Sequence, residues 1–473
     1  MSLQSKRFAL WEWVVLLVAL AIYFAICVIT IRLGSPLGHD EALYATRARE
    51  FLNGDPQATW FLPNRAPGLP LLLSLAWIGN ATEPYLRMVV SMSGAALIVF
   101  TWLLGRLLVG RVGAIIAAFG MALTPVVVVA GTQVWPDVPG AAVGMAALYF
   151  YALGLSGPRF RWWTVAVVIA LIAAAIVIRF GAPVPLAVAF IGLTLWKWPR
   201  ERERKSRVVI VALAAAVIAW SFLMTPLITG GGIPGRTITV GSSDNPAFQG
   251  FFDYWNLRSR LISGSAAIGL IGLVIGLVGS LFDRSLAKAF LWPFGIGVIT
   301  FVAIAAVVHG EARYLAPAYP WLWIAAGAGL AAAGNRVPRA LSVSMAVVLL
   351  VGLLPLMPRL TDDAQEFNMG FTTIETAARS LDTGEDCGVI TSYTPQVEWY
   401  SGCEAVVIHE DRLVVDSPHL PNGPRYLFIV HGGKRQPDEE LMEDYLDETT
   451  GEPRPFGPPG QRLRYVETWE LED

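Results

Sequence analysis

Three ionisable residues stand together where the first long apolar run ends, in the stretch GHDEALYATRARE. Charged groups at a bilayer edge are costly to bury, so His39, Asp40 and Glu41 are either solvated or put to use. The spacing predicts a helix in which Asp40 has two alternative roles. It could cap the helix N-terminus, or it could accept a proton from a bound hydroxyl as a general base. Glu41 is a second catalytic candidate and could take the cap instead.

Two further motifs carry isolated charges. FLPNRAPGLPLLLSLAWIG holds Arg65 in a proline-rich turn before an apolar, membrane-hugging helix. Arg65 could contact lipid headgroups, or it could bind a phosphate through its guanidinium. In GTQVWPDVPG, Asp137 lies between Pro136 and Pro139 at the start of an apolar span. Asp137 could cap that span, or it could bind and orient an acceptor as a second catalytic acid.

Two later motifs complete the set of polar candidates. Arg179 ends the run AIVIRFGAPVPL, and HGEARYLAPAYP contains His309, Glu311, Arg313 and Tyr314. A His/Glu pair can ligate a divalent metal, whereas an ion pair between Glu311 and an arginine is the simpler alternative. The sequence contains no HExxH spacing, so no cofactor is firmly expected. A divalent metal stays open, with Glu41, His309 and Glu311 as weak candidate ligands.

Composition places these motifs in a polytopic membrane protein. Of 473 residues, 55% are hydrophobic and only 15% are charged, against about a quarter charged in soluble domains. Runs of about 20 apolar residues recur, which is the length of a membrane-crossing helix. About eleven spans are expected, at 10–32, 86–109, 112–130, 138–155, 162–178, 182–196, 208–228, 261–282, 289–308, 314–334 and 340–355.

The distribution of basic residues predicts the sidedness. Alternate connections gather basic residues on one side, which is typical of the cytoplasmic face. This orientation puts the N-terminus in the cytoplasm and every polar motif described above on the opposite face of the plasma membrane. A basic cluster that joins two membrane spans does not favour nucleic-acid binding. These basic residues are Lys6, Arg7, Arg106, Arg111, Arg159, Arg161, the cluster KWPRERERKSR, Arg284, Lys288, Arg336 and Arg339.

The charge balance divides the chain near residue 357. Residues 357–473 carry 24 acidic and 9 basic side chains, whereas residues 1–356 carry 13 acidic and 26 basic ones. We therefore expect a transmembrane domain over 1–356, with a first extracytoplasmic loop at 33–85 containing juxtamembrane helices, and a soluble extracytoplasmic domain over 357–473. Strand-like and helix-like runs alternate in this tail, which predicts a small α/β sheet domain. Cys387 and Cys403 each begin a candidate strand, so they could meet as a disulfide if these strands are parallel neighbours, or both stay free.

Taken in order, these motifs resemble the GT-C glycosyltransferases of the protein O-mannosyltransferase and lipid A aminoarabinose transferase superfamily. Asp40 stands at the position of the family's catalytic aspartate, and Arg65-Ala66-Pro67-Gly68-Leu69-Pro70 resembles its basic-Pro-Pro element, with one proline lost and arginine in place of lysine. Asp137 matches the second acidic position before the fourth span. Arg179-Phe180-Gly181 and ARYLAPAYP match later elements approximately.

This resemblance implies a GT-C fold and an inverting hexosyl- or pentosyltransferase. Its donor would be a sugar on polyprenyl phosphate, and its acceptor a cell-envelope glycan or glycolipid on the extracytoplasmic face. The donor phosphate would meet Arg65, Arg179 and Arg313, with Tyr314 and His309 beside them, and the acceptor hydroxyl would meet Asp40. Where some relatives carry metal-linked acids and histidines, this chain has only loose counterparts.

Two other classes of protein fit part of the pattern. Intramembrane charges could mark the path of a multi-pass transporter or flippase for a lipid-linked or anionic solute. The charges gather at one face rather than at mid-bilayer, however, and no inverted repeat is evident. A non-catalytic assembly subunit with a decayed site is the third class. The sugar, the acceptor and the polyprenol are not encoded in any motif of the sequence.

Overall fold

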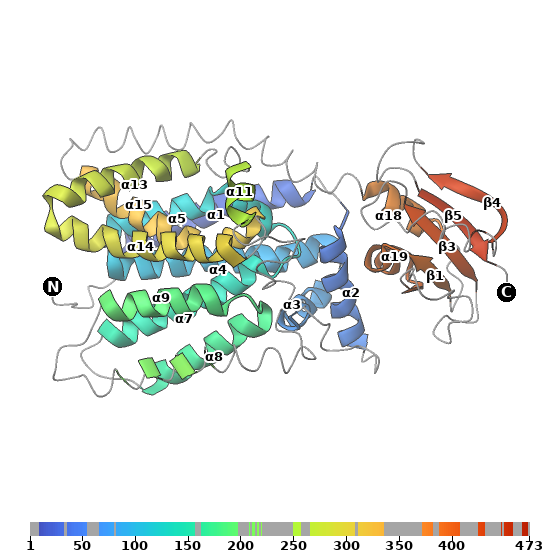
Figure 1. The fold of residues 1–473 in the computed structure, drawn as a ribbon, viewed down its shortest axis with the longest axis horizontal. Helices are drawn as coiled ribbons and strands as arrows, with labels where there is room; N and C mark the ends of the chain where they lie inside the picture. Colours follow the sequence, from blue (N-terminus) through green and yellow to red (C-terminus); the bar gives the residue numbers. More distant parts are fainter. Residues whose placement is uncertain are drawn as a thin grey trace. The chain divides into compact units, whose positions relative to one another are not determined.

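The structure is a computed structural model of the chain, and it describes residues in both expected domains (Figure 1). The described residues are 9–32, 36–53, 66–79, 82–156, 162–196, 249–256, 265–307, 311–334, 371–381, 387–406, 424–430, 446, 449–456 and 466–471, with isolated positions between 208 and 219. The expected span at 340–355 and most of the span at 208–228 lie outside these ranges.

Helices, most of them apolar, make up most of the described residues before residue 335. Their bounds are α1 Leu10–Arg32, α2 His39–Asn53, α3 Gly68–Leu73, η1 Ser74–Gly79, α4 Glu83–Leu108, α5 Arg111–Ala122, α6 Pro125–Gly131, α7 Asp137–Ser156, α8 Trp162–Ile178, α9 Pro183–Trp196, α11 Gln249–Asn256, α13 Ser265–Phe282, α14 Arg284–Val307, η3 Ala312–Leu315 and α15 Tyr319–Gly334. The helix predicted in the opening motif is therefore confirmed as α2.

Among the described residues, α1, α4, α7 and α14 are long and apolar enough to cross a membrane. The third expected span is broken, because α5 and α6 meet at an angle of 57°. Pro125 explains the break, since proline cannot donate the backbone hydrogen bond that a continuous helix needs. The chain is a membrane protein, and the expected number of eleven spans stays a prediction.

The chain divides into two compact units. The helical unit comprises Met1–Ile29, Thr59–Ala81 and Arg87–Leu360, and the sheet unit comprises Thr30–Ala58, Thr82–Leu86 and Thr361–Asp473. The boundary between Leu360 and Thr361 lies close to the one expected at residue 357. The sheet unit also includes α2 and the first residues of α4, which were expected in the transmembrane domain. This grouping places Asp40 in the same compact unit as the C-terminal sheet.

Small residues allow close packing in the helical unit, where α15 contacts α5, α13 and α14 (Figure 1). Gly327 of α15 lies against Gly113 of α5, and a Cβ atom at Gly113 would stand only 3.1 Å from the carbonyl oxygen of Gly327. Lipid is as apolar as leucine, so helices in a membrane gain from such close van der Waals contact. Trp323 of α15 also donates a 2.8 Å hydrogen bond from Nε1 to Thr124 Oγ1, at the α5–α6 break.

The C-terminal residues form a five-stranded mixed sheet with helices α18 Thr372–Arg379 and α19 Thr394–Ser401. The strands are β1 Gly388–Thr391, β2 Glu404–Val406, β3 Arg425–Val430, β4 Thr449–Phe456 and β5 Val466–Leu471, in the order β2-β1-β3-β5-β4. Strand β1 lies between β2 and β3 and is parallel to both, whereas β5 is antiparallel to β3 and β4. The small α/β domain predicted for the tail is confirmed.

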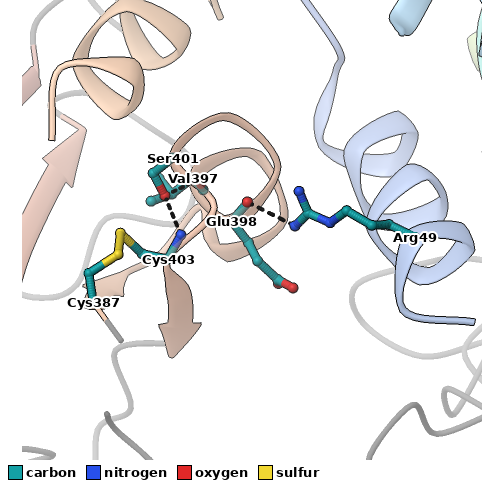
Figure 2. The surroundings of a disulfide bond; sticks show 6 residues. All are labelled: Arg49, Cys387, Val397, Glu398, Ser401 and Cys403. Atoms are coloured by element: carbon teal, nitrogen blue, oxygen red, sulfur yellow. Dashed lines mark hydrogen bonds between the residues drawn. A yellow bond between two sulfur atoms is a disulfide. The ribbon is translucent and has the colours of Figure 1, made fainter. Parts of the chain in front are cut away.

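Parallel pairing of β1 and β2 brings two cysteines together. Gly388 pairs with Glu404, so the residues just before them are neighbours, and Cys387 and Cys403 form a disulfide. Of the two alternatives left by the sequence, the structure has the bridged one (Figure 2).

The Gly113–Gly327 contact gives a testable prediction for the helical unit. A Cβ atom on Gly327 would collide with the carbonyl oxygen of Gly113, so Gly327→Ala should lower the unfolding free energy by about 1–3 kcal/mol through overpacking. Gly295 of α14 is the matched control, because a Cβ atom there meets nothing within 4 Å. Gly295→Ala should leave the thermal midpoint in detergent unchanged or raise it, since alanine favours helix. Equal midpoints for the two variants would contradict this packing argument.

Candidate active site

A buried carboxylate lies at the start of α7. Asp137 is the first residue of this helix, follows Pro136 and is only 2% exposed. Its carboxylate forms an ion pair with Nη1 of Arg179 through Oδ1, and its Oδ2 lies 4.0 Å from Nε of Arg313. Desolvated carboxylates are costly unless paired, so these two guanidiniums account for a charge in this position.

Arg179 reaches Asp137 from the turn that follows α8. Its amide donates to the carbonyl of Ala175, and its carbonyl accepts from the amide of Ala182, which starts the turn into α9. The first turn of α7 leaves room for this side chain, because a Cβ atom on Gly140 would lie 3.1 Å from Cβ of Arg179. Gly140 is three residues after Asp137, so both lie on the same face of α7.

Arg313 enters the same cluster from η3, where α14 leads into α15. Its Nε lies 2.5 Å from Oε2 of Glu311, and its guanidinium carbon lies 4.2 Å from the ring centroid of Trp135. The Tyr314 ring lies 5.1 Å from the guanidinium carbon of Arg179 and 5.3 Å from that of Arg313. Aromatic faces attract guanidinium groups, so Trp135 and Tyr314 help to fix both arginines.

We call Asp137, Arg179, Glu311, Arg313 and Tyr314 the arginine cluster. Its two arginine side chains are 17% and 11% exposed. A guanidinium has five N–H donors in a planar fork, and its geometry matches phosphate oxygens. The cluster therefore combines fixed positive groups with carboxylates that hold them, which is an arrangement suited to an anionic ligand.

Two further segments contact the cluster or the helix that leads into it. Tyr254 of α11 donates from its hydroxyl to the carbonyl of Glu311 at 3.3 Å. Gly68, at the start of α3, lies against the end of α8, because a Cβ atom there would stand 2.7 Å from the carbonyl oxygen of Val177. Close packing thus requires a glycine at this position of the RAPGLP motif. The residue it packs against, Val177, is two residues before Arg179.

In the sheet unit, α2 carries Asp40 and Glu41 in its first turn. Glu41 is 1% exposed, and its Oε2 accepts a 2.8 Å hydrogen bond from the amide of Gly38, which precedes the helix. This contact is one half of a capping box. Glu41 thus satisfies the helix terminus as the sequence allowed, and Asp40 beside it is partly exposed.

The predicted site residues now fall into three groups. Asp137, Arg179, Arg313, Tyr314 and Glu311 come together in the helical unit, and Asp40 and Glu41 lie in the sheet unit. Arg65 and His309 lie outside the described residues.

Two of the three candidate metal ligands, Glu41 and Glu311, lie in the described residues. Within the described ranges, no group of three or more His, Cys, Asp or Glu residues is placed to hold a metal ion. Glu41 and Glu311 instead contact Gly38 and Arg313. The third candidate, His309, is one of the residues that the structure does not describe.

Sequence reasoning missed Trp135 and Gly140. Trp135 lies two residues before Asp137, and an aromatic next to an acidic residue at a span edge is a weak signal by itself. It becomes informative only when a distant arginine, here Arg313, stacks on it. Gly140 was one of many glycines, and its role emerges from the position of Arg179.

A carboxyl group with a raised pKa lies where α19 contacts α2. Burial, and after it the charge of the neighbouring Glu50, raise the pKa of Glu398 from its ordinary value of 4.5 to about 7. Arg49 and Arg47 oppose this shift, and Glu404 adds to it. The Glu398 backbone carbonyl accepts a 3.1 Å hydrogen bond from Arg49 Nη2 (Figure 2).

Comparisons with known proteins identify the fold. Residues 64–225 match the family described as dolichyl-phosphate-mannose-protein mannosyltransferase. The structure resembles ArnT from Cupriavidus metallidurans in the apo state, with a TM-score of 0.64 and 15% identity over 97% of both chains. It resembles the same protein bound to undecaprenyl phosphate with a TM-score of 0.63 and 15% identity over 98% of both chains.

A third similar structure is AglB, the archaeal oligosaccharyltransferase from Archaeoglobus fulgidus, in complex with an inhibitory peptide and a dolichol-phosphate. Its TM-score is 0.59 at 16% identity, covering 84% of this chain and 64% of that one. No curated protein matches the chain in sequence. The chain has the fold of ArnT and AglB, and the resemblance to the GT-C glycosyltransferases that its motifs indicate is confirmed at the level of the fold.

The raised pKa of Glu398 predicts how the stability of the sheet unit depends on pH. The folded-state pKa of Glu398 is about 7, above the ordinary 4.5. Its contribution to the unfolding free energy is therefore fully present below pH 4.5 and is lost as the pH rises through about 7. The thermal unfolding midpoint of the sheet unit should therefore decrease as the pH is raised from about 5 to about 8. Glu398→Gln should make the midpoint depend less on pH. Glu452→Gln, at an exposed position in β4, should keep the wild-type slope. Identical slopes for wild type and Glu398→Gln would refute the assignment.

Proposed function

Because the chain has the GT-C fold, we propose that it is an inverting glycosyltransferase. It transfers a hexose or pentose from a polyprenyl-phosphate donor to a glycan or glycolipid of the cell envelope, on the extracytoplasmic face of the plasma membrane. The observation that carries the proposal is the arginine cluster. Its two guanidiniums lie at the ends of apolar helices, where the phosphate of a membrane-held lipid would stand.

The arginine cluster suits the leaving group of this reaction. When the bond between the sugar and the phosphate breaks, negative charge develops on the departing oxygen, and fixed cations stabilise that charge without reorganising. Asp137 and Glu311 hold Arg179 and Arg313 in place, and Trp135 and Tyr314 stack on them. Asp137 is then an orienting residue for the guanidiniums, a more specific role than the sequence alone suggested.

The similar structures support the nature of the donor. The ArnT structure contains undecaprenyl phosphate, and the AglB structure contains a dolichol-phosphate. Both ligands combine a phosphate with a long isoprenoid chain. Arg65 joins the proposed phosphate ligands, since it stands three residues before Gly68, which packs beside the end of α8. His309 stands two residues before Glu311 and is a weaker proposal of the same kind.

Asp40 is the proposed general base. Glu41 bonds the Gly38 amide at the start of α2, and Asp40, next to it in the first turn, is partly exposed. In the reaction, the acceptor hydroxyl oxygen attacks the anomeric carbon and its proton passes to Asp40. The bond between that carbon and the phosphate oxygen breaks, the configuration inverts, and polyprenyl phosphate leaves.

The disulfide supports an extracytoplasmic site. Disulfides persist in oxidising compartments and are rare in the cytosol. The bridge between Cys387 and Cys403 thus favours an outer location for the sheet unit. The excess of basic residues in alternate loops favours a cytoplasmic N-terminus. Both observations agree with the same orientation of the chain.

The role of Asp40 is tested by its amide variant. Asp40→Asn should lower kcat by about 10²–10⁴-fold, because a positioned base contributes about that much. Mass spectrometry of envelope glycolipids should then show loss of one sugar and accumulation of its lipid-linked donor. Glu50→Gln on the same helix is a matched control and should retain transfer. Full transfer by folded Asp40→Asn protein would reject the role of this residue. Solute flux without sugar transfer would favour a transporter instead.

The role of the arginine cluster is tested at Arg313. Arg313→Lys keeps the charge but loses the planar fork and its stacking on Trp135, so KM for the lipid donor should rise about ten-fold or more. Arg284→Lys is the matched control, because Arg284 is exposed at the start of α14. Steady-state kinetics with a defined polyprenyl-phosphate sugar would measure both variants. Equal KM values would contradict a donor-binding role for Arg313.

A further inference from the structure

The helix that carries Asp40 is bound at both ends by α19. At its start, His39 Nδ1 donates to Gln396 Oε1 at 3.0 Å. At its other end, Arg49 donates to the carbonyl of Glu398 at 3.1 Å, and its guanidinium carbon lies 5.4 Å from the ring centroid of Trp399 (Figure 2). Contacts ten residues apart along α2 fix its direction as well as its position.

Tyr400 of α19 joins the two ends of the first outer loop. Its hydroxyl oxygen accepts a 2.6 Å hydrogen bond from the amide of Leu37, just before α2. The same hydroxyl bonds the carboxylate of Glu83, at the start of α4. Arg379 of α18 lies 4.9 Å above the Tyr400 ring and 3.8 Å from Oε1 of Glu83. One side chain of the C-terminal domain thus contacts residues near both ends of the expected loop at 33–85.

The disulfide closes the segment in which α19 lies. Cys387 precedes β1 and Cys403 follows α19, so the bridge spans β1, α19 and the turn between them. Ser401, the last residue of α19, accepts from the Cys403 amide at 3.1 Å through Oγ and donates to the carbonyl of Val397 at 2.7 Å (Figure 2). The chain has three cysteines, and the third, Cys27, is free and buried in α1. A mild reductant therefore has one bond to act on.

We propose that the disulfide-closed segment 387–403 positions α2, and through it Asp40, so that glycosyl transfer depends on the redox state of the C-terminal domain. The proposal rests on the proposed role of Asp40. Tyr400, Arg49 and Gln396 are positioning residues in this account, since they act through α2. Asp40 lies between His39, which contacts Gln396, and Glu41, which contacts Gly38, so a shift in α19 reaches Asp40 through one turn of helix.

Positioning of this kind has a measurable consequence. A general base must stand within hydrogen-bond reach of the proton it accepts, and a displacement of about 1 Å can reduce the rate by about 10²-fold. The donor-binding arginines lie in the helical unit. Loosening α2 should therefore reduce kcat while leaving KM for the lipid donor unchanged.

The experiment combines amide hydrogen exchange with kinetics on the full-length protein in nanodiscs. Tyr400→Phe removes the hydroxyl and keeps the ring, so exchange in α2 should speed up about five- to ten-fold. Exchange in α15 of the helical unit should not change. Reduction of the wild-type disulfide should have the same effect, and reoxidation should restore slow exchange and full kcat. Tyr85→Phe is the matched control, because Tyr85 is 52% exposed in the first turn of α4.

The outcomes separate this inference from the proposed function. Faster α2 exchange together with a kcat lowered about ten-fold at constant donor KM, in both Tyr400→Phe and the reduced protein, supports it. Arg49→Lys should restore part of the kcat lost in Arg49→Ala, since lysine keeps the charge. Unchanged α2 exchange overturns the inference, whatever the activity of Asp40→Asn. Faster exchange with unchanged kcat overturns it as well, as does an equal effect of Tyr85→Phe.

Discussion

The ion pairing of one buried carboxylate with two guanidiniums is the constraint on which the rest of this structure depends. Asp137 is desolvated, and Arg179 and Arg313 reach it from two other parts of the chain. Removing one member of such a group leaves an uncompensated charge in a dry environment. The turn after α8, the short η3 and the glycine at 140 make this pairing sterically feasible. The cluster thus ties the paths of several helices to one point, which is the proposed phosphate site.

The two compact units carry different groups of the proposed reaction. The helical unit supplies fixed positive charge from rigid apolar helices packed through glycines such as Gly113 and Gly327. The sheet unit supplies Asp40 on a helix that its own α19 holds by hydrogen bonds. A lipid-linked donor and a polar acceptor differ in where they are held, so separate units for the phosphate and the base suit their different environments. The disulfide stabilises the unit that is proposed to face an oxidising compartment.

Much of the fold followed from the sequence, because long apolar runs, the helical spacing of the opening motif and the alternating tail each have a local physical cause. The interaction of Arg179 with Asp137 did not, since their contact depends on the packing of α7 against α8. Trp135 was missed because its partner, Arg313, comes from η3, far along the chain. The broken third span shows that a proline can outweigh continuous hydropathy. The sequence left the helix cap open between Asp40 and Glu41, and the structure shows Glu41 bonded to the Gly38 amide. The catalytic role of Asp40 stays a prediction. Arg65 and His309 lie outside the described residues, so their roles stay predictions.

The central claim is that the arginine cluster binds the phosphate of a polyprenyl lipid, and that Asp40 contributes to transfer rather than to binding. Phosphorus NMR of undecaprenyl phosphate in nanodiscs containing the protein tests it most directly. The account predicts a saturable shift of the phosphate resonance with wild type and with Asp40→Asn, and its loss with Arg179→Ala. A shift that persists in Arg179→Ala protein, or that disappears in Asp40→Asn protein, would contradict it.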